Sequence, residues 1–247
     1  MSLNILILGA TSGIAQAVAR RYASEQASLF LVARDLAKLQ MVAADLRARG
    51  ATRVETHQAD AMDYAALQAM CSAAWQTLPP IDVALIAHGT LPDQERAQDD
   101  LDYAVREFRA NGESAIAAMA IMARHFEAQG RGVLAVIGSV AGDRGRGSNY
   151  VYGAAKAAVD AYASGLRARL FKAGVHVLTI KPGFVATPMT AHLDLPARLT
   201  VQPERVADDI VNAIARKRDV LYTPGFWRLI MTVIKLVPGA LFKRSNL

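Results

Sequence analysis

Short apolar runs alternate with longer amphipathic stretches along most of the chain, and this alternation limits the fold more than any other feature of the sequence. Several runs are apolar at every position, which is typical of strands in a parallel sheet that helices cover on both faces. The pattern therefore predicts an α/β fold with a doubly wound parallel sheet. The expected strands are residues 3–8, 29–33, 54–58, 83–87, 133–137 and 175–180, and the expected helices are residues 15–25, 36–49, 64–76, 99–129 and 154–173.

Length and composition favour one folded domain. A chain of 247 residues with 53% hydrophobic and 20% charged residues can form a continuous core, and no low-complexity linker or repeat divides it. Cys71 is the only cysteine in the sequence, so no internal disulfide is expected. No group of Cys and His residues has the spacing of metal ligands, so no metal site is expected either.

The net charge of +6 raises the question of a nucleic-acid partner. The basic residues are scattered except near the C-terminus, and no nucleic-acid-binding motif accompanies them, so we expect no such partner. The first ten residues, MSLNILILGA, have no basic segment before the apolar run and are typical of a first strand, not of a signal peptide. A cytoplasmic location is therefore expected.

A glycine-rich segment, GATSGIA at residues 9–15, joins the first expected strand to the first expected helix. Such a turn lets the backbone approach a pyrophosphate closely, and free N–H groups at the helix start favour its negative charge. The third small residue is Ala15 in place of glycine, and a purely structural turn is the alternative. The nucleotide-binding candidates in the loop are Gly9, Thr11, Ser12, Gly13 and Ile14.

Arg34 and Asp35 stand at the end of the second expected strand, where one side chain selects between dinucleotides. Arg34 would pair with the 2′-phosphate of NADP(H), so NADP(H) is favoured. Asp35 would instead bind ribose hydroxyls, which keeps NAD(H) open, and Arg34 as a solvated loop charge is the other interpretation. Asp60, after the third expected strand, would accept a hydrogen bond from the adenine amino group or cap the next helix.

Tyr152 and Lys156 have the i and i+4 spacing that places two side chains on one face of a helix. A neighbouring ammonium group would favour the phenolate of Tyr152 and ease proton exchange with a substrate oxygen. A Tyr–Lys pair at this spacing is also typical of a solvated helix face. Ser139, however, follows the strand expected at 133–137, where its hydroxyl would hydrogen-bond a substrate carbonyl. Together the three residues indicate a site of proton transfer.

The motifs resemble, in their order along the chain, those of the short-chain dehydrogenase/reductase family, and the resemblance covers essentially the whole chain. It implies a Rossmann-like NAD(P)-binding domain over residues 1–225, with a substrate lid around residues 187–203. It also implies hydride transfer between a nicotinamide and a carbonyl or alcohol carbon. The matching residues are GxxxGxA at 9–15, Asp60, Asn111, Ser139, Tyr152, Lys156 and PGFVAT at 182–187.

The resemblance implies a role for each matching residue. Tyr152 would move the proton, Lys156 would also contact the nicotinamide ribose, and Asn111 would hold a proton-relay water beside Lys156. Thr187 and the backbone of Val185 would contact the carboxamide. The catalytic candidates are Asn111, Ser139, Tyr152 and Lys156, and the cofactor-binding set adds Ala87, Gly89, Tyr152, Lys156, Pro182, Gly183, Val185 and Thr187.

The segment after the fourth expected strand departs from the family pattern. The usual Asn-Asn-Ala-Gly is IAHG here, at residues 86–89. His88 therefore lies where the cofactor ribose is expected, and we assign it local packing and hydrogen bonding. The expected chemistry does not use the missing asparagines, so activity should persist.

A narrower resemblance, to decaprenylphosphoryl-2-keto-ribose reductases, implies reduction of a lipid-linked keto-sugar. It rests on VALIAHG at 83–89, AGDRGRGSNYVYG at 141–153, MTAHL at 189–193 and the tail at 221–244. A 3-oxoacyl reductase or a general ketone/alcohol oxidoreductase of the same family is the alternative. A non-catalytic nucleotide sensor or a protein scaffold would not need Ser139, Tyr152 and Lys156. The family also implies a homodimer or homotetramer, with the helices at 99–129 and 154–173 as candidate interfaces.

Residues 226–247 form an apolar and basic C-terminal extension. The apolar run at 226–237 is shorter than the roughly 20 residues of a membrane span, so a helix at the inner face of the membrane is one interpretation. A helix that closes the substrate pocket or forms a dimer contact is the other. The expected apolar face comprises Phe226, Trp227, Ile230, Val233, Ile234 and Val237, and the residues expected at anionic headgroups are Arg228, Lys235, Lys243 and Arg244.

Overall fold

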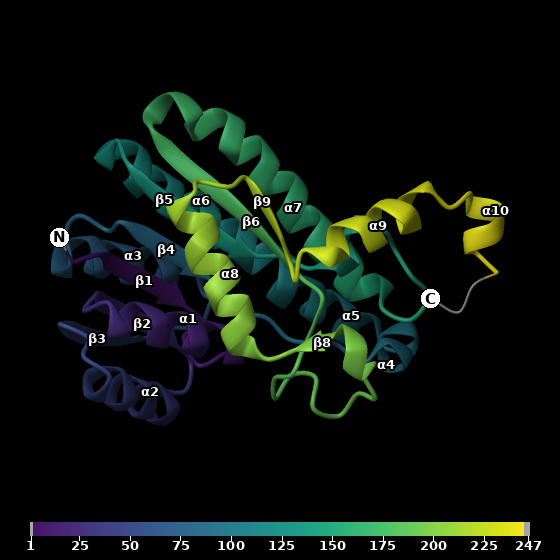
Figure 1. Cartoon of the computed structure of the whole chain (residues 1–247), viewed down its shortest axis with the longest axis horizontal. Helices are drawn as coiled ribbons and strands as arrows, with labels where there is room; N and C mark the ends of the chain where they lie inside the picture. The colour runs from purple at the N-terminus through teal and green to yellow at the C-terminus, as the bar shows by residue number, and fades with distance from the viewer. Residues whose placement is uncertain (1, 245–247) are drawn as a thin grey trace.

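A computed structural model describes residues 2–244 of the chain. Within them, seven strands form one parallel sheet in the order β3-β2-β1-β4-β5-β6-β9 (Figure 1). The chain crosses from one half of this sheet to the other between β3 and β4, which leaves a crevice at the carboxyl ends of β1 and β4. The predicted doubly wound sheet is thus confirmed. The strands are β1 Asn4–Leu8, β2 Ser28–Ala33, β3 Arg53–Gln58, β4 Val83–Ile86, β5 Gly132–Ile137, β6 Val175–Pro182 and β9 Val220–Thr223.

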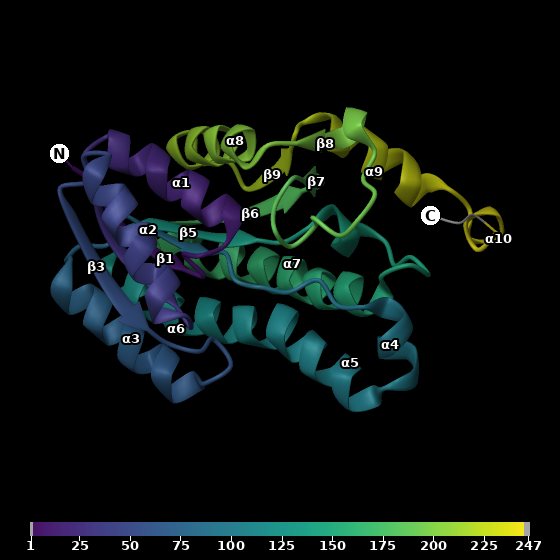
Figure 2. The same cartoon turned by 90° about the horizontal axis from the view of Figure 1, so that it is seen from below.

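Helices cover both faces of the sheet, as Figure 2 shows. Alternate residues of β1 serve the two faces: Ile5 and Ile7 belong to one buried cluster, and Leu6 and Leu8 belong to the other. The central strands are therefore apolar at every position because both of their faces are buried. On the first face lie α1 Gly13–Ser24, α2 Leu36–Ala48 and α8 Pro203–Ala215, and on the second lie α3 Tyr64–Thr77, α6 Ser114–Gln129 and α7 Tyr150–Leu170. Cys71 of α3 is fully buried.

The helix expected at 99–129 is present from Leu101 to Gln129, although it begins after a break at Asp100 and contains a π-helical turn. α4 Gln94–Asp99 ends before Asp100, whose carboxylate accepts a hydrogen bond from the Tyr103 N–H at 2.9 Å and begins α5 Leu101–Phe108. A π-helical turn, Arg109–Glu113, then joins α5 to α6. Side-chain caps such as this aspartate start new helices, and π turns often occur at functional sites. The turn carries Asn111 into the interior, where its side chain is 1% exposed.

The helix expected at 154–173 begins earlier and ends earlier. α7 starts at Tyr150, so Tyr152 and Lys156 both lie in its first two turns, and residues Phe171–Ala173 form a separate 3-10 turn. Helix α8 and strand β9 were not predicted. Two short strands, β7 Phe184–Val185 and β8 Thr200–Val201, pair with each other and fix both ends of the segment expected to be the lid.

The described chain ends in α9 Phe226–Leu236 and α10 Gly239–Phe242, which project beyond the end of the sheet (Figure 1). The last three residues of the expected extension, 245–247, lie outside the described residues. Across residues 2–244, no helix is both long enough and apolar enough to cross a membrane.

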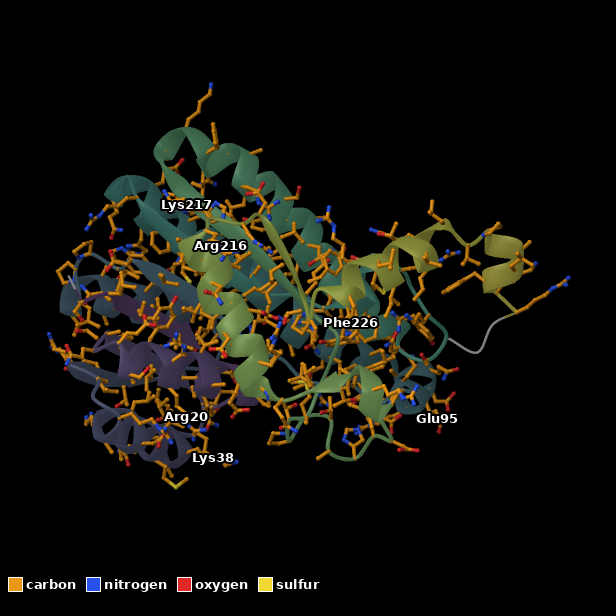
Figure 3. The ribbon with its side chains drawn as sticks, in the orientation of Figure 1. Arg20, Lys38, Glu95, Arg216, Lys217 and Phe226 are labelled. Carbon is orange, nitrogen blue, oxygen red and sulfur yellow. The ribbon has the colours of Figure 1, made fainter. Side chains whose placement is uncertain are left out.

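Helix α9 has two apolar faces, and the residues expected to form one apolar face are divided between them. Trp227 is 3% exposed and Met231 is fully buried, and Ile230 and Ile234 pack beside them against the domain. The opposite side of the helix is apolar and exposed. We call this side, which starts at Phe226 (Figure 3), the outer face of α9; it comprises Phe226, Leu229, Val233 and Leu236.

Candidate active site

A cavity of about 420 Å³ opens at the carboxyl ends of the central strands. Every residue that the sequence analysis assigned to cofactor binding or catalysis lines this cavity: Gly9, Thr11, Ser12, Gly13, Ile14, Arg34, Asp60, Ala87, Gly89, Asn111, Ser139, Tyr152, Lys156, Pro182, Gly183, Val185 and Thr187. In the part of the chain that the structure describes, no group of His, Cys, Asp and Glu residues is placed to hold a metal ion.

The glycine loop brings backbone to the cavity wall. Gly9 has φ +85°, and a Cβ there would lie 2.5 Å from the backbone N of His88, so only glycine fits this turn. Ser12 then caps α1 by accepting a hydrogen bond from the Ala15 N–H at 3.3 Å. Because Gly13 and Ile14 begin α1 and line the cavity, the helix presents its positive end there. This end can hold a phosphate group.

His88 lines the cavity beside the glycine loop with one ring nitrogen unpaired. Its Nε2 lies 2.9 Å from the Ser114 Oγ, and that hydroxyl donates its only proton to the Ala110 carbonyl at 2.8 Å. Nε2 must therefore donate to Ser114, which leaves Nδ1 an acceptor. This buried Nδ1 has no partner among residues 2–244. Burial, with the charges of Lys156 and Arg34, lowers the pKa of His88 to about 3, so the ring stays neutral.

Arg34 and Asp35 are neighbours in the sequence, but their side chains have different surroundings. Arg34 lines the cavity, whereas the Asp35 carboxylate caps α2, accepting from the Lys38 N–H at 3.0 Å and lying 3.5 Å from the Lys38 Nζ. Asp60 lines the cavity as well, and its Oδ1 accepts from the Met62 N–H at 2.9 Å. The expected alternative, that Asp60 caps the next helix, was wrong because Asp63 caps α3.

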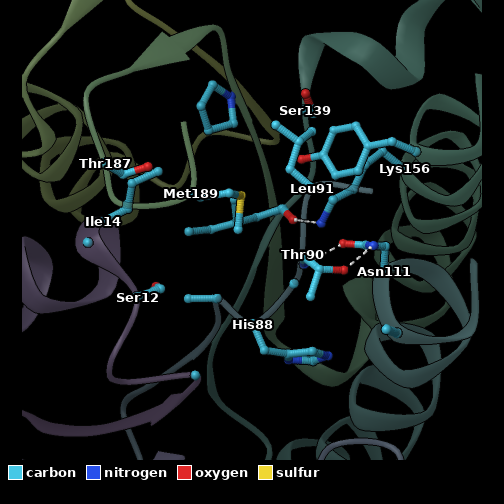
Figure 4. Close-up of a pocket in the computed structure, with 18 of the residues that line it drawn as sticks. Ser12, Ile14, His88, Thr90, Leu91, Asn111, Ser139, Lys156, Thr187 and Met189 are labelled. Atoms are coloured by element: carbon cyan, nitrogen blue, oxygen red, sulfur yellow. Dashed lines mark hydrogen bonds between the residues drawn. The ribbon is translucent and has the colours of Figure 1, made fainter. Parts of the chain in front are cut away.

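Three elements bring the expected catalytic side chains together. Figure 4 shows Ser139, Lys156 and Asn111 close together on one side of the cavity, opposite the glycine loop. The Lys156 Nζ donates to the Ile137 carbonyl at 3.0 Å and lies 5.7 Å from the centre of the Tyr152 ring. Ser139, two residues after β5, lies beside Tyr152, and its hydroxyl can hydrogen-bond the phenol. The arrangement places a phenol, a hydroxyl and an ammonium group around one point of the cavity.

Burial dominates the protonation of this site. It raises the pKa of Tyr152 to about 12, with the hydrogen bond from Ser139 opposing and Asp160 adding to the rise. The expected lowering of this pKa is thus not observed, because desolvation of the phenolate is the largest cause of the shift. Burial also lowers the pKa of Lys156 to about 8, and the Asp160 carboxylate partly offsets that decrease. At neutral pH the phenol is protonated and Lys156 is mostly an ammonium ion.

Asn111 is held by partners that the sequence analysis did not identify. Its Oδ1 accepts from the Thr90 N–H at 2.9 Å, and its Nδ2 donates to the Thr90 Oγ1 at 2.8 Å and to the Glu107 carbonyl at 3.0 Å. These bonds fix the amide beside Gly89, which the Lys156 Nζ also approaches. Sequence spacing gave no signal for them because Thr90 lies on a different element.

A buried ionic network lies behind Lys156, and the sequence analysis missed it too. The Lys181 Nζ lies 2.5 Å from the Asp143 Oδ1 and 2.8 Å from the Asp160 Oδ2. The Tyr222 hydroxyl donates to the other Asp143 oxygen at 2.7 Å. Burial alone would lower the pKa of Lys181, but Asp160 and Asp143 together raise it. Because Asp160 also acts on Lys156, the network connects β6 and β9 to the site of proton transfer.

Helix α9 is attached to the same region by several contacts, among them those of Trp227 and Arg144. The Trp227 indole lies over the backbone of Gly183, where any Cβ would overlap the ring, and its ring centre is 5.2 Å from that of Phe184. Arg144 donates to the Ile234 carbonyl and, at 2.7 Å, to the Val237 carbonyl at the end of α9. The loop after Ser139 and the loop after β6 are therefore both in contact with α9.

Comparisons with known proteins agree with this architecture. The family model described as short chain dehydrogenase matches residues 3–197. The chain is 38% identical to "Uncharacterized oxidoreductase Rv2073c" of Mycobacterium tuberculosis, covering 97% of this chain and 96% of that protein. It is 36% identical to "Uncharacterized oxidoreductase in mprA 5'region" of Streptomyces coelicolor, covering 98% and 95%. Neither relative is named more specifically than an oxidoreductase.

Solved structures share the fold. A short-chain dehydrogenase from Sphingobium yanoikuyae, in complex with NADPH, has a TM-score of 0.82 and 26% identity over 98% of this chain and 96% of its own. One from Burkholderia cenocepacia, in complex with NADP, has a TM-score of 0.84 at 19% identity over 98% and 97%, which shows the fold alone. With the family model matching most of the chain and relatives matching nearly all of it, this protein belongs to the short-chain dehydrogenase family.

Proposed function

We propose that the chain is an NADP(H)-dependent reductase that transfers a hydride to a substrate carbonyl while Tyr152 supplies the proton. One observation carries this proposal: Ser139, Tyr152 and Lys156 converge in the same cavity that the glycine loop and the start of α1 enter. A proton donor thus faces a site shaped for a dinucleotide. A nucleotide sensor without catalysis would not need the three convergent side chains.

Features of the cavity fit a dinucleotide phosphate. The backbone at Gly9 and the start of α1 suit a pyrophosphate, and the unpaired Nδ1 of His88 can accept a hydrogen bond from a ribose hydroxyl. The Arg34 guanidinium has no partner among the described residues and is available for a 2′-phosphate, whereas Asp35 is occupied by capping α2. Both the NADPH complex of the Sphingobium relative and the NADP complex of the Burkholderia structure support the same choice. NAD(H) would leave Arg34 unused.

The bound nicotinamide would supply or accept the hydride, and the chain's own residues handle the proton. Ser139 would turn its hydroxyl from Tyr152 to the substrate carbonyl oxygen and stabilise the charge that develops there. Tyr152, protonated at neutral pH, would donate its phenolic proton to that oxygen. The Lys156 ammonium then stabilises the phenolate left behind, and Asn111 would hold a water that returns the proton through Lys156.

The cofactor assignment is tested by titrating the protein with NADPH and NADH while following nicotinamide fluorescence. We expect NADPH to bind more tightly, and Arg34→Ala to weaken NADPH by about 10- to 100-fold because a charge-assisted contact with the 2′-phosphate is lost. Lys38→Ala, which removes an exposed charge outside the cavity, is the matched control. If the wild type binds neither dinucleotide, the oxidoreductase proposal itself fails.

For the substrate, the motif resemblance and α9 support a lipid-linked keto-sugar. The outer face of α9 offers exposed apolar side chains, with Leu229 71% and Leu236 77% exposed, and Arg228 and Lys235 lie on the same helix. An apolar helix face with basic flanks suits a lipid chain or the surface of an anionic membrane. A 3-oxoacyl or general ketone reductase is the alternative, and it gives the outer face no role.

Membrane contact predicts a specific effect of the outer face. Leu229→Ser combined with Leu236→Ser should weaken binding to phosphatidylglycerol vesicles by at least about tenfold, because two apolar side chains no longer enter the interface. Met41→Ser, at an exposed apolar residue of α2, is the control and should have no effect. Equal vesicle binding by the double variant and the wild type in a sedimentation assay would rule out this contact.

Two subunits would pair through the surface formed by helices α5 and α7. Leu101, Val105 and Phe108 of α5 are exposed apolar residues, and α5 packs beside α7. Such a patch suits a homodimer or homotetramer interface. Light scattering that finds only a monomer at micromolar concentration would contradict this proposal.

A further inference from the structure

Four charged side chains line the cavity within residues 2–244, and three of them already have an assigned role. Arg34 and Asp60 face the adenosine end of the proposed dinucleotide, and Lys156 supports proton transfer. The fourth is Arg146, in the loop between Ser139 and α7. Its charge needs an explanation, because a cation in a cavity is costly to leave unpaired.

Arg146 has no acidic partner in the part of the chain that the structure describes. Its side chain is half-buried, and within residues 2–244 the only hydrogen-bond partner of its Nη2 is the Sδ of Met231, a weak acceptor at 3.5 Å. Its Nε is buried and has no hydrogen-bond partner among residues 2–244. A guanidinium group with free N–H donors in a cavity is suited to bind two oxygens of an anion.

The neighbouring charges are already engaged. Burial lowers the pKa of Arg146; Asp143 is the acidic residue whose charge opposes this lowering, and its carboxylate is bound by Lys181 and Tyr222. Arg144 points to the end of α9, where it caps backbone carbonyls. Only Arg146 of this loop therefore offers an unused charge to the cavity.

A second unpaired group lies next to Tyr152. Asn149 immediately precedes α7, lines the cavity and has a buried Oδ1 without a partner among the described residues. Its amide can accept from a hydroxyl or, with the amide turned, donate to an oxygen anion. Arg146 and Asn149 thus leave two polar groups unsatisfied in the cavity that holds the reacting phenol. Apolar residues also line the cavity, among them Leu91, Val140, Phe184, Met189 and Leu193.

We propose that Arg146, with Asn149, forms an anion subsite that binds a phosphoryl or carboxylate group of the carbonyl substrate. The inference rests on the proposed reductase function and narrows its substrate class: a carbonyl compound that also has an anionic group and an apolar part. Because Arg146 contacts Met231, the subsite borders α9. An apolar chain attached to the anion could leave the cavity along this helix.

Three ligands with the same ten-carbon chain test the subsite: geraniol, geranic acid and geranyl phosphate. Their dissociation constants are measured by calorimetry with the full chain saturated with NADPH. We expect at least one anion to bind about 10- to 100-fold more tightly than geraniol, as charge-assisted hydrogen bonds would give. Arg146→Gln should abolish this difference, and Arg146→Lys should retain part of it. The anion that binds more tightly shows whether the subsite prefers a phosphate or a carboxylate group.

The control variant is Arg216→Gln, which removes the same charge from an exposed arginine just after α8 that does not line the cavity. It should leave the preference for anions unchanged, which excludes a general effect of the net positive charge. Anions that bind no better than geraniol, or a preference that survives Arg146→Gln, would overturn the subsite. NADPH binding by each variant is the separate readout: normal NADPH binding with no anion preference refutes only the subsite, whereas no NADPH binding by the wild type refutes the proposed function.

Discussion

The two ends of the cavity are built by different means. At the glycine loop, backbone geometry forms the wall: Gly9 allows the turn and α1 starts at the cavity edge. At the substrate side, side chains from distant segments hold the loops, as Lys181 holds Asp143 and Trp227 covers Gly183. A wall formed by backbone geometry tolerates few amino-acid substitutions, whereas contacts between side chains can be replaced by other pairs of side chains. One scaffold can therefore keep its cofactor while its substrate changes.

The largest effect should come from the residue where the two ends meet. Tyr152→Phe removes the proton donor and should lower the turnover of a ketone substrate by about 100- to 10,000-fold, while NADPH affinity stays the same. Steady-state kinetics and nicotinamide fluorescence measure the two quantities. Unchanged turnover would refute the role of Tyr152 and favour a protein that senses nucleotides.

The matched control is Tyr150→Phe, two residues earlier on α7. Tyr150 is 44% exposed and does not line the cavity, so its hydroxyl should contribute nothing to turnover. A loss of activity in this control would indicate that the start of α7 is disturbed in both variants.

A second prediction tests whether α9 is part of the domain or only an attachment. Trp227→Ala removes a buried indole and should lower the free energy of unfolding by about 3 kcal/mol, because a cavity is left over Gly183 and Phe184. Urea titration measures the change, and Phe226→Ala, at a partly exposed position, should cost about 1 kcal/mol or less. Equal, small losses in both variants would mean that α9 detaches without affecting the rest of the domain.

The smallest effect concerns the network behind Lys156. Turnover should decrease as the pH rises through about 8, because Lys156 then loses the proton that stabilises the phenolate of Tyr152. The Asp160 carboxylate raises the pKa of Lys156, so Asp160→Asn should lower that pKa and move the decrease in turnover to lower pH. Asp208→Asn, at an exposed site on α8, should not move it. A shift to higher pH would contradict the electrostatic argument.

Most of the sheet could be predicted from the sequence because strands buried on both faces are continuous apolar runs. Helix α8 was missed although Pro203 at its first position and buried Val206 and Ile210 provide the signal. The break at Asp100 was missed because a capping carboxylate looks like any polar residue of an amphipathic helix. Such local features can be recognised once the caps are considered.

The cavity residues could be predicted because ordered motifs mark them, although their roles stay predictions. The contacts that hold the substrate side could not. Lys181 meets Asp143 and Asp160 only because β6 lies beside the helix and loop that carry them. The two faces of α9 likewise depend on where Trp227 docks. Neither contact has a fixed sequence spacing, so only the folded chain shows it.

The position of Cys71 has a practical consequence for thiol chemistry. This cysteine is fully buried in α3, and burial raises the pKa of its thiol to about 12, so it should not react with maleimides in the folded protein. A cysteine introduced at an exposed lid position such as Ala191 would then be the main reactive thiol, without removal of the native one. A dye attached there could report movement of the lid as ligands enter the cavity.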